Sequence, residues 1–458
     1  MKTRFLGLFA GIAVALIIYL LPIVGITNEG KIALALTLMT IIFWVCNVAH
    51  NGFVALLYCV LVILLGVAEP SVVFGSWTKT TFWMIIASFL IASAANNSGL
   101  TERLANAISL KMIKDYRSLI LTIALLNVVL AIIVPNVFPR CFLILAIVTK
   151  ICKSANVNKN DSIKLGFATF ALALPSILIF LTSDSSLNSL LLSYAPEYHV
   201  GWISWFIHMG IPALIAEILI TLLFMLLFKP EQDFHIDKNL FSDQLKGMGK
   251  FSEKEKKCLF WLCILVAFWL TDSIHHIDIS YGTLFIAVLM TLPLIGNLIT
   301  IEDWKSIPIN LLCFLTGSMA IGAVGAVTGM NDWIAATIMP TSMSENPFVL
   351  ALFISVIIII LHVLIGSTVT IMAVAVPIFL NFTASMTINP ICVLFIIYNT
   401  LVLQYFFSFQ QITLTSGVDL VGFNHKHTLR MSIPLIAVVF VVNCLICIPW
   451  WKMTGFLY

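Results

Sequence analysis

One stretch decides how the chain is organised, residues 347–382, which read PFVLALFISVIIIILHVLI GSTVT IMAVAVPIFLNF. A small polar cluster interrupts an apolar run, and lipid offers no hydrogen-bond partner to a bare backbone group at such a break. The first arm, Phe348–Ile365, is 18 residues long and can cross a hydrocarbon core of about 30 Å. The second arm, Ile371–Phe382, has 12 residues, or about 18 Å of helix, which is too short to cross. We therefore predict a re-entrant helical hairpin whose tip lies near the midplane, where transporters place their binding sites.

The same pattern occurs 230 residues earlier. Arg117–Val134 is an apolar arm, Pro135–Arg140 is the break and Cys141–Lys150 is a short second arm. Outside the hairpins, Ser98–Ala105 falls on Thr328–Ala335 under the same shift. A fixed internal period indicates a repeated architecture.

Composition places the chain in the membrane. Of its 458 residues, 61% are hydrophobic and 10% charged, and the mean hydropathy is +1.08, whereas about a quarter of a soluble domain is charged. The net charge of +3 gives no footprint for nucleic acid, and the ten cysteines lie in or beside apolar segments as small hydrophobes. We predict an all-α polytopic membrane protein with eleven spans and two re-entrant hairpins in two inverted repeats. The apolar segments are 5–25, 32–49, 53–68, 82–96, the hairpin 117–150, 163–192, 203–228, 258–274, 281–298, 308–328, the hairpin 348–382, 390–420 and 432–451.

Lysine and arginine predict the topology, because cytoplasmic loops carry an excess of both. Lys2 and Arg4 place the N-terminus in the cytoplasm, and basic residues flank both ends of the first hairpin. The segments on either side of the second hairpin, 331–346 and 381–390, contain neither residue, so both of its ends are expected outside. The two hairpins would then enter from opposite sides.

This topology predicts five regions. They are scaffold spans at 1–81, a first inverted-repeat core at 82–228 with hairpin 117–152, a cytoplasmic loop at 229–257, further scaffold spans at 258–310, and a second inverted-repeat core at 311–458 with hairpin 347–383.

The chain resembles the divalent anion:sodium symporter family of the ion-transporter superfamily. The resemblance rests on Phe314–Thr328 with Gly329, on the matching span Trp83–Gly99, and on the second tip, Gly366–Thr370. Family members carry Ser-Asn-Thr at both tips, and these residues hold a substrate carboxylate and help to form a sodium site. In this chain the second tip keeps Thr368, while Ser367 replaces the asparagine and Gly366 the serine.

The first tip departs further from the family pattern. Asn136-Val137-Phe138 stands where Ser-Asn-Thr is expected, so two polar side chains are missing. Arg140 lies where members resembling 2-oxoglutarate/malate translocators also have arginine, and Phe180-Leu181-Thr182-Ser183 resembles the same subgroup. An arginine is costly at membrane depth, and its planar fork suits a carboxylate. The alternative is that Arg140 snorkels to the surface from a shallow tip.

The candidate site residues follow from the two tips and from polar breaks at 182–186 and 413–416. The candidate substrate-binding residues are Asn136, Arg140, Thr182, Ser183, Ser367, Thr368 and Thr413. The candidate sodium ligands are Gly366, Thr368, Thr370, Thr415 and Ser416, since a hard cation takes oxygen ligands.

Three further ionisable residues lie in apolar segments. Asp184 belongs either to the polar break or to the outer interface. Glu217 and His362 are candidate proton carriers, and the alternative for each is a buried, hydrogen-bonded structural role.

We predict a secondary active transporter of small organic anions, di- or tricarboxylates, rather than an enzyme. It would work by alternating access at the cytoplasmic membrane, either as a sodium-coupled symporter or as an anion exchanger. The expected partners are the anion, membrane lipid and a second copy of the chain; no cofactor is expected beyond Na⁺ as a coupling ion. A transporter of an inorganic divalent anion such as sulfate is the alternative, as is a membrane enzyme or assembly protein. No nucleophile–base pair or metal-ligand cluster in the sequence favours the enzyme.

Overall fold

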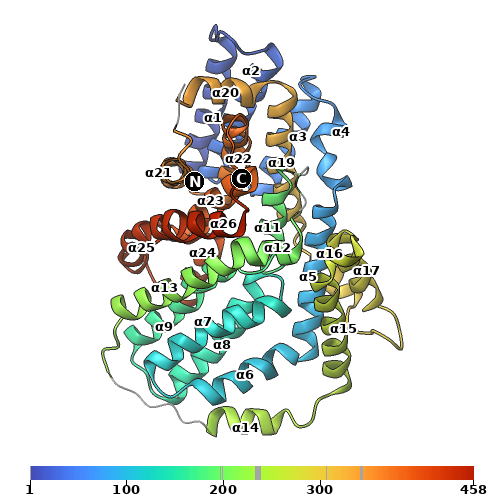
Figure 1. The fold of residues 1–458 in the computed structure, drawn as a ribbon, viewed down its shortest axis with the longest axis vertical. Coiled ribbons are helices and arrows are strands. Elements are labelled where there is room, and N and C mark those ends of the chain that lie inside the picture. Colours follow the sequence, from blue (N-terminus) through green and yellow to red (C-terminus); the bar gives the residue numbers. More distant parts are fainter. Residues whose placement is uncertain (1, 196–197, 199, 233–238, 306, 341–343) are drawn as a thin grey trace.

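The computed structural model describes the whole chain except residues 1, 196–197, 199, 233–238, 306 and 341–343 (Figure 1). Every regular element in the described part is helical. The first half comprises α1 (Lys2–Leu20), α2 (Asn28–Val45), α3 (Asn51–Leu64), α4 (Pro70–Val73), η1 (Gly75–Thr78), α5 (Thr80–Ser98), α6 (Leu100–Met112), α7 (Tyr116–Ile133), α8 (Val137–Ser154), α9 (Lys159–Ala171), α10 (Ala173–Ser176), α11 (Ser185–Leu192), α12 (Trp202–Trp205), the π-helical η2 (Phe206–Gly210) and α13 (Ile211–Leu227).

After the connecting helix α14 (Asn239–Gly247), a second series follows. It comprises α15 (Glu253–Leu270), α16 (Asp272–His275), α17 (Ile279–Leu289), α18 (Ile301–Lys305), α19 (Ile309–Val327), α20 (Met330–Ile338), α21 (Pro347–Ile365), α22 (Thr368–Thr383), α23 (Pro390–Leu403), η3 (Ser408–Gln410), α24 (Ile412–Val421), α25 (His425–Phe440), the π-helical η4 (Val441–Cys447) and α26 (Ile448–Thr454).

Several helices are long and apolar enough to cross a membrane. Within the described residues there are six, or seven if the bent pair formed by α5 and α6 counts as one span. Two of them are continuous helices of 26 and 30 residues that pass through the π-helical segments η2 and η4. The protein is therefore an integral membrane protein, as composition predicted, while the total of eleven spans stays a prediction. The six are Asn28–Val45, Tyr116–Ile133, Trp202–Leu227, Ile309–Val327, Pro347–Ile365 and His425–Thr454.

The order of elements recurs along the chain. The helices α5 and α19 each have 19 residues and end at a left-handed glycine, Gly99 (φ 83°) or Gly329 (φ 71°), before a short helix, α6 or α20. Each long helix packs on a helix from the other half, α19 on α3 and α5 on α17. A Cβ atom on Gly317 would lie 2.6 Å from the Cβ of Ala55, so the glycine lets α3 and α19 approach closely. This order follows the predicted 230-residue shift; the opposite orientation of the halves and the five region limits stay predictions.

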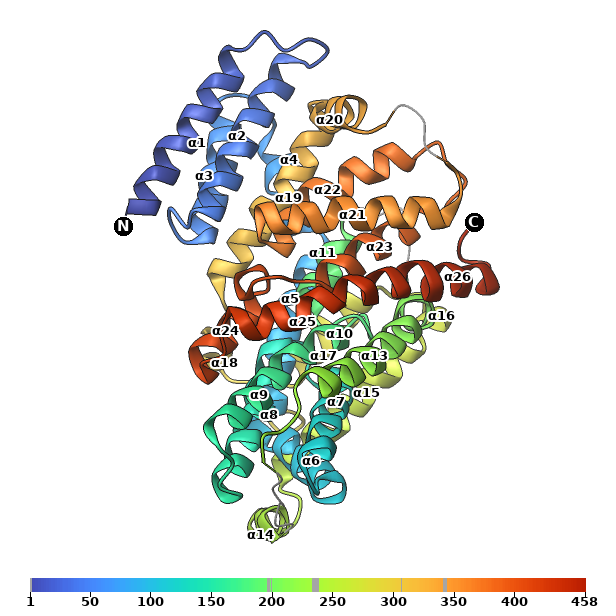
Figure 2. The same cartoon turned by 90° about the vertical axis from the view of Figure 1, so that its left-hand side faces the viewer.

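The two predicted hairpins are pairs of consecutive helices with tight connections, and their second arms are longer than predicted. The arm α22 has 16 residues instead of 12, about 24 Å, because Ser367 caps it so that it begins at Thr368, three residues before the predicted start, and it ends one residue later than predicted. The arm α8 begins at Val137 instead of Cys141, because Pro139 lies in its first turn, where a missing N–H is tolerated. Phe353 near the start of α21 contacts Phe379 and Phe382 near the end of α22, so these arms are antiparallel (Figure 2). Re-entry from one membrane face stays a prediction.

Two segments interrupt the helices that follow the hairpins. The first break covers residues 177–184 between α10 and α11, close to the predicted 182–186. The second covers residues 404–411 and includes only the short η3, whereas the predicted break at 413–416 is part of the helix α24. The prediction placed this break too late because it followed the hydroxyl residues, while glutamine side chains form the actual one.

Candidate functional site

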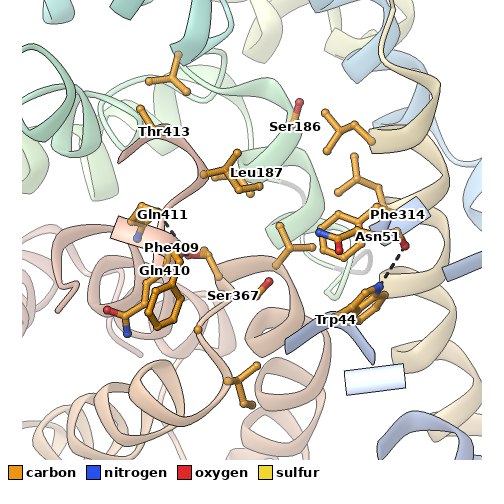
Figure 3. Close-up of a pocket in the computed structure, with 18 of the residues that line it drawn as sticks. Trp44, Asn51, Ser186, Leu187, Phe314, Ser367, Phe409, Gln410, Gln411 and Thr413 are labelled. Atoms are coloured by element: carbon orange, nitrogen blue, oxygen red, sulfur yellow. Dashed lines mark hydrogen bonds between the residues drawn. The ribbon is translucent and has the colours of Figure 1, made fainter. Parts of the chain in front are cut away.

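A cavity of about 540 Å³ lies where the two helix connections and the two breaks meet. In Figure 3, Phe409, Gln410 and Gln411 lie on one side, Trp44 and Asn51 lie on the other, and Ser367 lies between them. Its polar and charged lining residues are Asn47, Asn51, Asn136, Asp184, Ser186, Ser367, Thr368, Gln410, Gln411 and Thr413. The cavity has the size range of small-molecule sites.

The first tip presents a helix N-terminus to this cavity. Asn136 has an extended backbone, and its side chain accepts a hydrogen bond from the Phe138 N–H at 3.0 Å. The Pro135 carbonyl accepts one from the Ser185 N–H at 3.3 Å, which joins the tip to the first break. Val137 and Phe138 add apolar surface to the lining.

The second tip is built from a left-handed glycine and a capping serine. Gly366 has a φ of 72°, and a Cβ there would lie 2.7 Å from the Phe409 ring, so glycine is required on both grounds. Ser367 caps α22 by accepting from the Thr370 N–H at 3.3 Å. The Thr368 hydroxyl is 3.4 Å from the Gln410 carbonyl oxygen, at the edge of hydrogen-bonding range, which leaves it available to a ligand.

Amide side chains stabilise the non-helical backbone of the two breaks. These amide residues were not predicted from the sequence. The Asn188 amide donates to the carbonyls of Ile177, Phe180 and Leu181 at 3.0–3.1 Å, and its oxygen accepts from the Tyr398 hydroxyl at 2.6 Å. These bonds replace helix partners that the unwound backbone has lost.

The second break uses glutamines in the same way. Gln410 accepts from the N–H groups of Phe406 and Phe407 and donates to the His362 carbonyl at 2.6 Å, while Gln411 donates to the Leu401 carbonyl at 2.6 Å. Long amide side chains in an apolar segment are the signal that would have placed the second break correctly.

Helix N-termini contribute partial positive charge to the cavity. The N-cap residues of α8, α11, α22 and α24 all line the cavity; they are Asn136, Asp184, Ser367 and Gln411. Free N–H groups and the helix dipole favour an anion at such ends. Among the residues that the structure describes, Asp184 is the only charged side chain in the lining. It caps α11 through one carboxylate oxygen, which accepts from the Ser186 and Leu187 N–H groups. Asp184 is 4% exposed, so it belongs to the break rather than to the outer interface.

Arg140 lies behind the first tip and does not line the cavity. Its side chain is completely buried, which excludes snorkelling to the surface. The guanidinium donates to the Val134 carbonyl at 3.0 Å, the Ser183 carbonyl at 2.5 Å and the Ser176 hydroxyl at 3.2 Å. It therefore connects the end of α7, the first break and α10, and in this conformation its bonded donors are taken by protein oxygens.

The remaining predicted residues divide between the cavity and its surroundings. Asn136, Ser367, Thr368 and Thr413 line it, as does Gly366. Thr182 is buried behind it and accepts from the Trp202 indole at 3.1 Å. The other predicted residues do not line the cavity, and their hydroxyls form hydrogen bonds within the protein. The Ser183 hydroxyl accepts from the Phe180 N–H, and the other three, all candidate sodium ligands, donate: Thr370 to the Ser367 hydroxyl, Thr415 to the Ser408 carbonyl and Ser416 to the Ile412 carbonyl.

Comparison with known proteins gives consistent results. The family described as the sodium:sulfate symporter transmembrane region matches residues 2–457. The chain is 25% identical over 291 residues to the chloroplastic dicarboxylate transporter 2.1 of Arabidopsis thaliana, covering 60% of this chain and 51% of that protein. It is 23% identical over 316 residues to the putative malate transporter YflS of Bacillus subtilis strain 168, covering 66% and 65%. The chain thus spans between half and two thirds of the length of these relatives.

Solved structures show the same fold at low identity. The MtrF structure of Neisseria gonorrhoeae, from a class of antimetabolite efflux pumps, superposes with a TM-score of 0.53 at 13% identity and covers 90% of this chain and 97% of that one. The YdaH transporter of Alcanivorax borkumensis superposes with a TM-score of 0.50 at 12% identity and covers 81% and 85%.

Proposed function

The chain belongs to the sodium:sulfate symporter family, whose members are membrane transporters and not enzymes, and from this premise we propose that it carries small dicarboxylates across the membrane by alternating access. The substrate anion would bind in the cavity between the two tips. The single observation that carries this proposal is the convergence of the N-termini of α8, α22 and α24 on one cavity lined by amides and hydroxyls. The names of the relatives, dicarboxylate and malate transporters, support the same substrate class.

The proposed site comprises the polar groups that face the cavity. Asn136, Ser367, Thr368 and Thr413 would donate to the carboxylates of the substrate, together with the free N–H groups at the starts of α8 and α22. Gln410 and Gln411, added by the structure, would complete the second half. Arg140 would contribute its charge from behind the first tip without touching the anion.

Coupling and assembly are further parts of the proposal. Either a sodium ion would travel with the anion, held near Gly366 and Thr368, or one anion would exchange for another. The loss of two polar side chains at the first tip supports exchange. We place the protein in the cytoplasmic membrane with its N-terminus in the cytoplasm, as a homodimer, on the basis of the lysine and arginine distribution and the family resemblance.

The test uses purified protein in liposomes preloaded with unlabelled malate. Uptake of labelled malate, succinate and sulfate is measured with and without an inward sodium gradient. Exchange of the dicarboxylates is expected, and transport of sulfate alone would move the protein to the inorganic branch of its family. If none of the three anions is transported, the proposed function is wrong.

A substitution that removes the Thr368 hydroxyl tests whether the anion binds in this cavity. Thr368→Val removes a cavity hydroxyl at nearly constant shape, and a polar group left unpaired costs about 1–3 kcal/mol, so KM should rise about five- to hundredfold. The matched control is Thr383→Val on the same helix, whose hydroxyl bonds the Phe379 carbonyl away from the cavity and whose loss should leave KM unchanged. Equal KM values in the two variants would remove Thr368 from the site.

A further inference from the structure

Glu217 is a buried carboxyl group that does not line the transport cavity. It lies within the 26-residue span 202–227 and is 4% exposed, and among the described residues no group outside α13 forms a hydrogen bond with its carboxyl oxygens. One turn later on the same face of α13, the buried Thr221 hydroxyl is a hydrogen-bonding neighbour of this carboxyl group. A bare carboxylate in a low-dielectric interior would cost far more than the chain can offset, so this group is neutral in the present conformation.

A second unpaired acceptor lies at the same depth. The helices α7 and α13 pack together, and the Tyr116 hydroxyl at the start of α7 donates to the Phe228 carbonyl just beyond the end of α13, so the two helices are antiparallel. Asn127 and Glu217 are each eleven residues from that contact and are therefore level with each other. The Asn127 side-chain oxygen is buried, and within the described part of the chain it has no hydrogen-bond partner. The Glu217 carboxyl group and the Asn127 side-chain oxygen are therefore buried acceptors at the same depth, which is a suitable environment for a bound proton.

Arg140 is the cation that acts on this carboxyl group. The guanidinium donates to Ser176 on α10, and α10 packs on α13, so it lies beside the helix that carries Glu217. Among the described residues, the buried Arg140 Nε–H has no hydrogen-bond partner. Other ionisable groups on the packed elements lie elsewhere: Tyr116 and Arg117 at the start of α7, His425, Lys426, His427 and Arg430 on the first turns of α25, His208 on η2 stacked against Phe456, and Cys444 and Cys447 on η4. The helix α10 contributes none.

We propose that Glu217 is a proton-binding site that couples proton movement to anion transport, an inference that rests on the proposed function. With its proton bound, Glu217 is neutral and Arg140 holds the carbonyls of Val134 and Ser183. When the proton leaves, the carboxylate attracts the free Arg140 donor and draws the guanidinium away from those carbonyls. Because Ser183 precedes Asp184 and Val134 precedes the first tip, both cavity walls then change. The site takes up one proton and releases it unchanged.

The experiment separates this proposal from the proposed function. Liposomes containing the purified protein, free of sodium and clamped at zero potential, are assayed for malate exchange at equal pH and for net uptake with the outside acidified by about 1.5 units. One proton per dianion would drive accumulation up to roughly thirtyfold, since each pH unit corresponds to a factor of about ten. A pH dye inside the liposomes should report acidification together with uptake.

Glu217→Gln imitates the protonated carboxyl group and cannot release a proton. It should exchange malate within about twofold of wild type at equal pH while losing both the accumulation and the internal acidification. Glu217→Asp should retain them. The matched control is Asp272→Asn, which neutralises a buried carboxylate that already accepts from the Trp202 N–H.

Comparison of wild type and Glu217→Gln at the same two pH values cancels any change in the protonation of malate itself. If the proton gradient drives no malate accumulation in wild type, or drives it equally in Glu217→Gln, the proposed proton site is wrong. The proposed function is unaffected by that result as long as wild type exchanges malate. Loss of exchange at equal pH in a folded Glu217→Gln protein would also overturn it, because a permanently neutral group should support exchange. Absence of exchange in wild type would instead count against the proposed function.

Discussion

At the scale of single residues, Arg140 places a buried positive charge behind the first tip, from where we propose that it serves the anion site without lining it. Arg140→Gln leaves up to three buried oxygens without their donor, at about 1–3 kcal/mol each, and removes the positive charge behind the first tip. We expect it to abolish dicarboxylate exchange or to make exchange depend on sodium, with a lower melting temperature in detergent. Arg140→Lys should also be impaired, because an ammonium group lacks the planar fork that reaches all three oxygens. If vesicles containing Arg140→Gln exchanged dicarboxylate at the wild-type rate and with the wild-type affinity, this role would be contradicted.

Asp184 places a negative charge in the wall of a cavity proposed for anions. If a dianion were bound at an assumed separation of about 7 Å, it would be repelled by roughly 2 kcal/mol per charge at an effective dielectric constant of about 20. Asp184→Asn keeps the cap on α11, since asparagine is an equally good capping residue, and should lower KM for dicarboxylate at least about tenfold. Exchange kinetics at several substrate concentrations provide the measurement. A higher KM would indicate that the carboxylate serves a coupled cation instead.

At the scale of elements, an ion pair fastens α6 to α15. The Arg103 Nε lies 2.5 Å from a Glu255 oxygen, the two side chains are 10% and 4% exposed, and Arg103 also donates to the carbonyls of Met248 and Gly249. Hydrogen bonding from Arg103 holds the pKa of Glu255 below its usual value. The stabilisation is therefore present above the ordinary glutamate pKa and is lost as the pH falls through the lowered value.

Glu255→Gln should expose this contribution. Breaking a buried pair costs about 3 kcal/mol, so the variant should melt at a lower temperature than wild type near neutral pH. The difference should shrink as both proteins are taken below the lowered pKa, because wild type then loses the same charge. Melting curves in detergent across this pH range test the idea, with Glu253→Gln, an exposed neighbour on the same helix turn, as the control. Parallel pH profiles for wild type and Glu255→Gln would show that the pair adds no stability.

The elements also show what the sequence could and could not predict. The long arms α7 and α21 lie within a residue or so of their predicted limits, because hydrophobic length alone decides them. The second break was misplaced because its backbone is held by Gln410 and Gln411, whose partners are up to 48 residues away along the chain. The importance of Arg140 was predicted from the cost of burying its charge, yet two of its three partners are backbone carbonyls, which every residue carries and which the sequence therefore cannot reveal.

At the scale of the whole molecule, the remaining prediction is that the two halves face opposite sides of the membrane. The basic residues around the first hairpin and their absence around the second place Ser154 in the cytoplasm and Ser344 outside. Both positions are exposed and lie next to the ends of a hairpin arm, so a cysteine should be tolerated and reachable. In a cysteine-free background, Ser344→Cys should react with an impermeant thiol reagent added to intact cells, whereas Ser154→Cys should react only after the membrane is opened. Restoring Cys152, a buried thiol beside Ser154, provides the control for reagent that labels inaccessible sites. Labelling of both cysteines from the same side would mean that the halves are parallel, and the cavity could not then alternate between the two faces by the symmetric exchange of its two tips.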